Sequence, residues 1–240
     1  MEKTELICLP FAGGNRYSYR LYNEAASPSL KMIPLEYPGR GSRLDAAFIT
    51  DIDCLVEDLY QQARSVMSFQ RYAIYGHSMG GLLACLLARK MIENNEVPPL
   101  HVFITGTIGP AAVSRMNSKR HLLGKEEFIK ELRRLKGIPE EILDNKEMFY
   151  FLEPIIRADF RICDEYVYKE QPPLHIPFTV ITGTEEDMKT EDIQLWQKET
   201  EHVIDFRQIP GYHFFIFDHP AAVMGIISDK LLNHSKIIHS

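Results

Sequence analysis

The chain has 240 residues, of which 45% are hydrophobic and 25% are charged. This composition is typical of a soluble globular protein and excludes a disordered chain or a fibrous repeat. The 27 basic and 33 acidic side chains give a formal net charge of −6, which argues against a nucleic-acid partner. At this length we expect a single domain over residues 1–240.

The four cysteines are widely spaced in the sequence, at Cys8, Cys54, Cys85 and Cys163. Because they form no C-x-x-C pair, they predict buried free thiols in a reducing compartment and neither a zinc site nor a redox motif. The apolar run at residues 6–9 is too short for a signal-peptide core or a membrane span. We therefore expect a cytoplasmic protein without a membrane partner.

Short apolar runs alternate with longer helical patterns along most of the chain. The expected strands are residues 6–9, 32–35, 72–75, 101–105, 178–182 and 205–209. Several are apolar on both faces, as buried parallel strands are. Apolar residues recur at helical spacing over residues 52–67, after a cap at Thr50 or Asp51, and over residues 82–92. The pattern predicts an α/β fold with a mostly parallel central sheet and flanking helices.

The alternation stops between about residues 110 and 173, where helical patches occur without a convincing strand. We expect this segment to be a helical insertion perched on the sheet. Its first part, residues 109–136, contains eight basic and three acidic side chains. The simpler interpretation of this excess is a solvated helix face, and the alternative is a docking surface for an acidic partner that includes Arg133 and Arg134.

The strongest motif is the sequence GHSMGG at residues 76–81, directly after the expected strand 72–75 and directly before a helical pattern. In this context G-x-S-x-G indicates a nucleophile elbow, whose glycines permit the tight turn that exposes the Ser78 hydroxyl. The next helix directs its positive end at the site, and the Met79 amide can donate to an oxyanion. The alternative is a glycine-rich turn in which Ser78 only caps the helix.

A serine nucleophile needs a histidine base, and in such folds the base follows the acid in the chain. His213 is our candidate because it lies in the loop directly after the last expected strand. His219, just ahead of Pro220, is the closest competitor, although it is more typical of the entry to the final helix. His77, inside the elbow, is expected to be structural and to point away from the serine hydroxyl.

The acid is expected at the end of the strand 178–182, where the chain continues GTEED. Glu185, Glu186 and Asp187 compete there, and either residue type can orient the histidine. Asp187 is our candidate because it has the shorter side chain usual in this role, and Glu186 is the alternative.

The loop after the first expected strand reads LPFAGG over residues 9–14. Such a loop can bring the backbone amide of Phe11 or Ala12 opposite that of Met79 and so complete an oxyanion hole. Ala-Gly-Gly alone is also common in ordinary turns, but together with a nucleophile elbow it fits the second half of an oxyanion hole.

Together these motifs resemble those of the type II thioesterases that accompany nonribosomal peptide and polyketide synthases, within the α/β-hydrolase superfamily. The similar segments are PFAGG at 10–14, YPGRG at 37–41, GHSMGG at 76–81, RAD at 157–159 and GYHFF at 211–215. Two positions depart from the family pattern. Tyr212 stands where the family usually has glycine before the catalytic histidine, and the family's acid position is Glu186 here rather than Asp187.

The resemblance implies that Ser78 attacks an acyl thioester on the phosphopantetheine arm of an acyl or peptidyl carrier protein. It implies that His213 takes the hydroxyl proton, that water releases the acyl enzyme, and that the task is to clear stalled or wrongly primed acyl groups. Residues 110–173 correspond to the family's helical lid. A thioester substrate agrees with the chemistry, because a thiol leaves more readily than an alkoxide.

No metal and no cofactor of the protein's own is expected, because the chain has no H-E-x-x-H, no P-loop and no G-x-G-x-x-G after a strand. A monomer is the expected state. Two other functions share these features: a carboxylesterase or lipase acting on oxygen esters, and a ligand-binding protein that keeps the fold without turnover.

Overall fold

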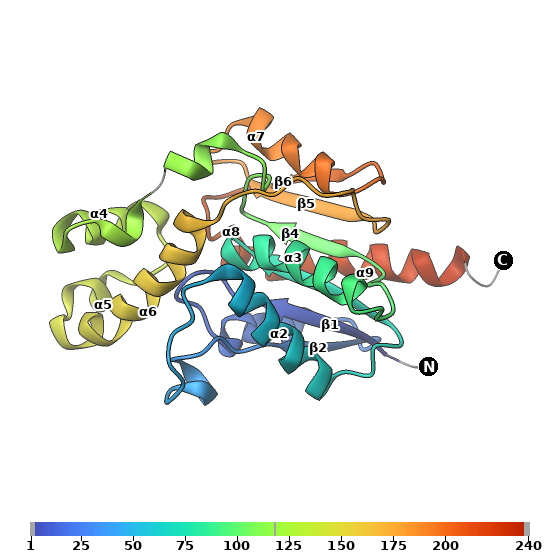
Figure 1. Ribbon diagram of the computed structural model, residues 1–240, viewed down its shortest axis with the longest axis horizontal. Coiled ribbons are helices and arrows are strands. Elements are labelled where there is room, and N and C mark those ends of the chain that lie inside the picture. Colours follow the sequence, from blue (N-terminus) through green and yellow to red (C-terminus); the bar gives the residue numbers. More distant parts are fainter. Residues whose placement is uncertain (1–2, 118, 238–240) are drawn as a thin grey trace.

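Six short segments form one parallel sheet in the computed structural model, which describes residues 3–117 and 119–237 (Figure 1). The strands are β1 (Thr4–Leu9), β2 (Leu30–Pro34), β3 (Tyr72–His77), β4 (Val102–Thr105), β5 (Phe178–Gly183) and β6 (Asp205–Ile209). Their spatial order is β2-β1-β3-β4-β5-β6, and every neighbouring pair is parallel. Strands β1, β3, β4 and β5 are buried along their whole length, which explains their apolar runs. The predicted parallel α/β fold is confirmed.

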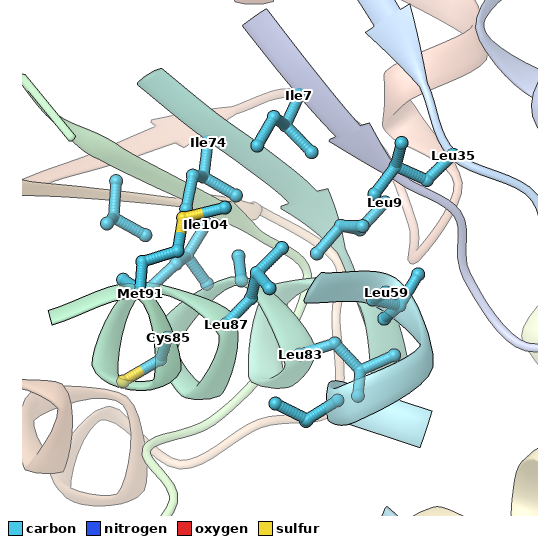
Figure 2. Packing of buried hydrophobic residues seen from close by; sticks show 14 of the residues in the cluster. Ile7, Leu9, Leu35, Leu59, Ile74, Leu83, Cys85, Leu87, Met91 and Ile104 are labelled. Carbon is cyan, nitrogen blue, oxygen red and sulfur yellow. The ribbon is translucent and has the colours of Figure 1, made fainter. Parts of the chain in front are cut away.

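Helices cover both faces of this sheet. They are α1 (Arg20–Ala25), α2 (Ile52–Val66), α3 (Met79–Glu93), α7 (Thr190–Gln194), α8 (Phe215–Asp218) and α9 (Pro220–Ile237). On one face α2 packs beside α3, and Leu59, Leu83 and Leu87 meet Ile7 and Ile74 of the sheet (Figure 2). On the other face α1 packs against α9. Within the described part of the chain, no helix is both long enough and apolar enough to cross a membrane.

Helix α2 begins at the predicted cap. The Asp51 side chain accepts a hydrogen bond from the Cys54 amide at 2.8 Å, which satisfies one of the free amides of the first turn. The same turn exposes Cys54 to solvent, whereas Cys8 and Cys85 are buried and Cys163 is half-buried. The expectation of buried thiols is therefore wrong for Cys54, because the adjacent Leu55 and Val56 occupy the core side of the helix.

The segment between β4 and β5 carries the helices α4 (Lys125–Leu135), α5 (Glu140–Asp144) and α6 (Lys146–Glu165). Short 3-10 turns complete the fold at Arg16–Tyr19, Gly41–Arg43, Val113–Asn117, Arg120–Leu122 and Leu195–Glu199. Helices α4, α5 and α6 lie together beyond one end of the strands (Figure 1). They enclose a small apolar cluster of their own that includes Phe128, Leu143 and Phe149. The segment therefore covers one end of the strands and adds no strand to the sheet.

Candidate active site

The turn between β3 and α3 presents Ser78 in an unusual backbone conformation. Its φ and ψ are 56° and −115°, a region that residues other than glycine rarely occupy. The turn is tight: a Cβ on Gly76 would lie 1.9 Å from the Gly80 carbonyl oxygen, and a Cβ on Gly80 would lie 2.0 Å from that of Leu9. The Ser78 amide donates to the Thr105 carbonyl at 2.8 Å. This geometry is that of the nucleophile elbow that the motif predicts.

His213 connects the serine to a carboxylate. Its ring lies in the loop between β6 and α8, where Nε2 is 3.1 Å from Ser78 Oγ and Nδ1 is 2.7 Å from Glu186 Oε1. The His213 side chain is 18% exposed and that of Glu186 only 3%. The structure thus brings Ser78 and His213 into hydrogen-bonding distance across 135 residues of chain, in an arrangement that can pass a proton.

The carboxylate on His213 is that of Glu186, so the prediction of Asp187 is wrong. The turn after β5 brings the Glu186 side chain back over the strand, and its Oε2 accepts a hydrogen bond from the Gly183 amide at 2.7 Å. The longer side chain spans the distance to His213 while keeping this second bond. Asp187, one residue further, is exposed. The pKa of Arg134 is raised chiefly by its hydrogen bond to Glu131 and to a smaller extent by the negative charge of Asp187.

His77 lies behind the site, as the sequence predicts. It is fully buried, its Nδ1 is 2.9 Å from Thr105 Oγ1, and its ring centroid is 4.9 Å from that of His213. Burial lowers the pKa of His77 well below its ordinary value, and a positive charge on His213 would lower it further. His219 ends α8 directly before Pro220, which agrees with its expected place at the entry to the last helix.

The loop that follows β1 closes on itself beside the serine. The Gly14 amide donates to the Phe11 carbonyl at 2.8 Å, and the Gly13 amide donates to Asp159 Oδ2 at 2.7 Å. Because a trans peptide directs its N–H opposite to its C=O, the Ala12 N–H points out of this turn. Among the described residues, no hydrogen bond from the Phe11 or Ala12 amide to a protein acceptor is formed.

Two pockets meet at Ser78 and His213. The smaller, of about 170 Å³, is termed the apolar pocket here and is walled by residues of the inserted segment together with Phe11 and Ala12. Its apolar wall includes Leu132, Leu135, Ile142, Leu152, Ile156 and Phe160. The larger, of about 820 Å³, is termed the charged pocket, and it is lined among others by Arg115, Lys119, Arg120, Arg134, Glu185 and Asp187. The site can therefore hold an apolar group on one side of the serine and a polar one on the other.

Four of the eight basic side chains in the stretch at residues 109–136 are paired with carboxylates in the described structure. Arg133 contacts Glu140 at 2.8 Å and Asp144 at 2.7 Å, and Arg134 contacts Glu131 at 2.8 Å. Glu140 and Asp144 come from beyond the stretch, so the local count overstates the positive charge of the folded surface. The surface around Arg133 and Arg134 is exposed and of mixed charge, and Arg134 also lines the charged pocket.

One feature beside the serine was not recognised from the sequence as a contact. Arg40 and Asp159 form a buried ion pair next to the loop 11–14, with Nη1–Oδ2 and Nη2–Oδ1 distances of 2.5 and 2.6 Å. The available signal was that two of the family-like motifs, YPGRG and RAD, each contain one member of an oppositely charged pair.

Comparison with known proteins shows matches along nearly the entire chain. The family model that describes the thioesterase domain matches residues 4–231. The gramicidin S biosynthesis protein GrsT of Aneurinibacillus migulanus is 31% identical over 217 residues, which cover 90% of this chain and 84% of that protein.

Solved structures show the same likeness. The crystal structure of ClbQ, from the colibactin NRPS/PKS pathway, superposes with a TM-score of 0.93 at 28% identity and covers 98% of this chain and 100% of that one. BorB, the type II thioesterase from the borrelidin biosynthetic cluster, superposes with a TM-score of 0.86 at 31% identity and covers 95% and 93%. The resemblance and the α/β-hydrolase fold expected from the sequence are confirmed.

Proposed function

The chain belongs to the thioesterase-domain family, and on this basis we propose that it hydrolyses acyl thioesters on the phosphopantetheine arm of acyl or peptidyl carrier proteins. The physiological task would be the removal of aberrant or stalled acyl groups from a nonribosomal peptide or polyketide synthase. The relatives named above support this proposal, since their names assign them to the biosynthesis of gramicidin S, colibactin and borrelidin.

The observation that carries the proposal is the continuous hydrogen-bonded chain Ser78–His213–Glu186 at the meeting point of the two pockets. In the proposed reaction, Ser78 Oγ attacks the thioester carbonyl carbon while His213 Nε2 takes the hydroxyl proton. Glu186 holds the proton on Nδ1 and stabilises the imidazolium that forms. The amide of Met79 and that of Ala12 or Phe11 donate to the oxyanion.

Breakdown of the tetrahedral intermediate releases the thiol of the arm, and the proton on His213 Nε2 goes to its sulfur. Because a thiol has a pKa near 8.5, this leaving group needs less help than an alkoxide would. Water then enters, gives a proton to His213 and attacks the acyl-serine carbonyl. Collapse of the second intermediate returns the proton to Ser78 Oγ and releases the carboxylic acid.

The two pockets suggest how such a substrate lies. The acyl chain fits the apolar pocket beneath α4, α5 and α6, and the amide-rich arm fits the charged pocket. Residues 110–173 would then act as a lid within a single domain of residues 1–240. We further propose that the enzyme is a cytoplasmic monomer that uses no metal and no cofactor besides the arm of its partner.

The test is intact-protein mass spectrometry of a carrier domain loaded with an acyl-phosphopantetheine group. The wild-type protein should remove the acyl mass, Ser78→Ala should leave it in place, and Ser65→Ala, at an exposed serine of α2, should match wild type. Faster turnover of a matched oxygen ester would favour a carboxylesterase. A fluorophosphonate probe that fails to label Ser78 would favour a non-catalytic protein.

A further inference from the structure

A buried ion pair ties the inserted helices to the loop after β1. Arg40, in the loop after β2, and Asp159, on α6, form two parallel contacts of 2.5 and 2.6 Å. Their side chains are only 5% and 2% exposed. Such a bidentate pair fixes direction as well as distance, because both guanidinium nitrogens are engaged by one carboxylate.

The pair also holds the main chain of that loop. Asp159 Oδ2 accepts the Gly13 amide at 2.7 Å, and Arg40 Nη1 donates to the Gly14 carbonyl at 3.1 Å. The hydroxyl of Tyr37, three residues before Arg40, donates to the Pro10 carbonyl at 2.7 Å. Groups from two other segments of the chain therefore hold the loop at both ends.

Fold stability alone does not account for this arrangement. Replacing a buried ion pair by apolar side chains of similar size is often neutral or even stabilising, because both charges lose their hydration on burial. What apolar replacements could not supply is an acceptor for the Gly13 amide and a donor for the Gly14 carbonyl. The ion pair therefore fixes the directions in which the peptide groups between Phe11 and Gly14 point.

We propose that Arg40 and Asp159 are positioning residues, which act by fixing the Ala12 amide where it can donate to the oxyanion. With the Gly13 amide bound to Asp159 and the Phe11 carbonyl bound to Gly14, the Ala12 amide is left pointing away from the turn. This inference rests on the proposed thioesterase function. An oxyanion donor must be in place before the reaction, so a small displacement slows the chemical step more than it weakens substrate binding.

The test is the double variant Arg40→Met with Asp159→Leu, which removes both charges together. We expect this variant to fold with a lowered thermal midpoint, because the Gly13 amide and the Gly14 carbonyl lose their partners. For the folded protein, kcat for a small acyl thioester should fall about 10- to 100-fold with KM changed by less than about threefold. A folded double variant with wild-type kcat would overturn the proposal. The single variant Arg40→Lys keeps the charge but cannot form the two parallel contacts, and it should also lose kcat.

The chain offers a matched control in the same loop. Arg43 and Asp58 form a second bidentate pair, with both distances 2.6 Å, but Arg43 binds the Glu36 carbonyl rather than the loop 10–14. The double variant Arg43→Met with Asp58→Leu should therefore keep kcat. An equal loss of kcat in both double variants would show that the effect is general and would refute a role specific to Arg40 and Asp159.

A second readout separates this inference from the proposed function. The rate at which a fluorophosphonate labels Ser78 depends on the same oxyanion donors but on no particular substrate. If wild type is labelled but cleaves no thioester, the proposed function fails, and a labelling rate lowered in the Arg40/Asp159 double variant alone would still support the positioning role. An unchanged labelling rate together with an unchanged kcat would contradict it.

Discussion

Glu186 Oε1 lies 2.7 Å from Nδ1 of His213, while the other oxygen of the same carboxylate accepts the Gly183 amide at 2.7 Å. Substitution Glu186→Gln should be damaging because of this second bond. The amide oxygen of the new side chain must face Gly183, so its NH₂ group faces His213 Nδ1. The imidazole proton is then forced onto Nε2, where it prevents proton transfer from the serine. We expect kcat to fall about 10³- to 10⁴-fold, measured by thioester hydrolysis.

The matched control is Asp187→Asn. Asp187 is exposed, lines the charged pocket and makes no hydrogen bond to His213 in the described structure. We therefore expect kcat for a small acyl thioester within about threefold of wild type, since the contacts among Ser78, His213 and Glu186 are kept and only an exposed charge is lost. If Asp187→Asn is the more damaging of the two variants, the assignment of Glu186 is wrong.

The choice between Glu186 and Asp187 could not be made from the residues of this turn alone. The short side chain of Asp187 made it the more usual candidate, and strand periodicity placed both residues in the same turn. The outcome depends on the Gly183 amide, which draws the Glu186 carboxylate back over the strand. A contact between a side chain and the backbone three residues earlier has no signature in the order of residues alone. The family-like spacing did indicate Glu186.

The elbow should not tolerate a methyl group at Gly76. A Cβ there would meet the Gly80 carbonyl oxygen at 1.9 Å, and this neighbour is main chain that cannot rotate away. We expect Gly76→Ala to lower the thermal midpoint by more than 10 °C or to prevent folding, measured by calorimetry. Gly225→Ala is the control because it lies in α9 with nothing within 4 Å of the added carbon. It should be neutral or stabilising by up to about 1 kcal/mol, and equal losses in both variants would contradict a clash specific to the elbow.

Buried His77 should make the fold sensitive to acid. Its pKa is lowered well below the ordinary value, chiefly by burial. Below about pH 6.5 the unfolded chain therefore binds a proton that the folded chain does not, and stability is lost as the pH falls. The loss should reach at most about 1.4 kcal/mol per pH unit from this residue. Urea unfolding at pH 7 and pH 5 should show a smaller acid-induced loss for His77→Gln than for wild type, and equal losses would rule out this origin.

The apolar pocket should set the acyl length that the enzyme accepts. Leu152 of α6 lines this pocket, so Leu152→Trp should shorten it. We expect kcat/KM for an octanoyl thioester to fall at least 10-fold relative to that for an acetyl thioester, since each excluded methylene removes favourable burial. Tyr150→Trp, at a residue of the same helix that is 71% exposed, should leave the ratio unchanged. A parallel change in both variants would place the acyl chain elsewhere.

The sheet, the elbow and His213 follow from short-range patterns, because alternation of strands and helices fixes where each strand ends. The ion pair between Arg40 and Asp159 does not, since its members are 119 residues apart and on elements whose packing is decided by the inserted helices. The shapes of the two pockets likewise depend on how α4, α5 and α6 pack over the ends of the strands. Such contacts emerge only when the whole chain is folded.

Helix α6 contributes to two tasks with one face. Ile156 and Phe160 line the apolar pocket, and Asp159, which shares their side of the helix, holds the loop beside the serine. Evolutionary changes of this face that admit a bulkier acyl group would also displace the loop beside the serine and so slow the reaction. Leu132 on α4 and Ile142 on α5 line the same pocket without this burden, so these two helices are where new acyl preferences can evolve most freely.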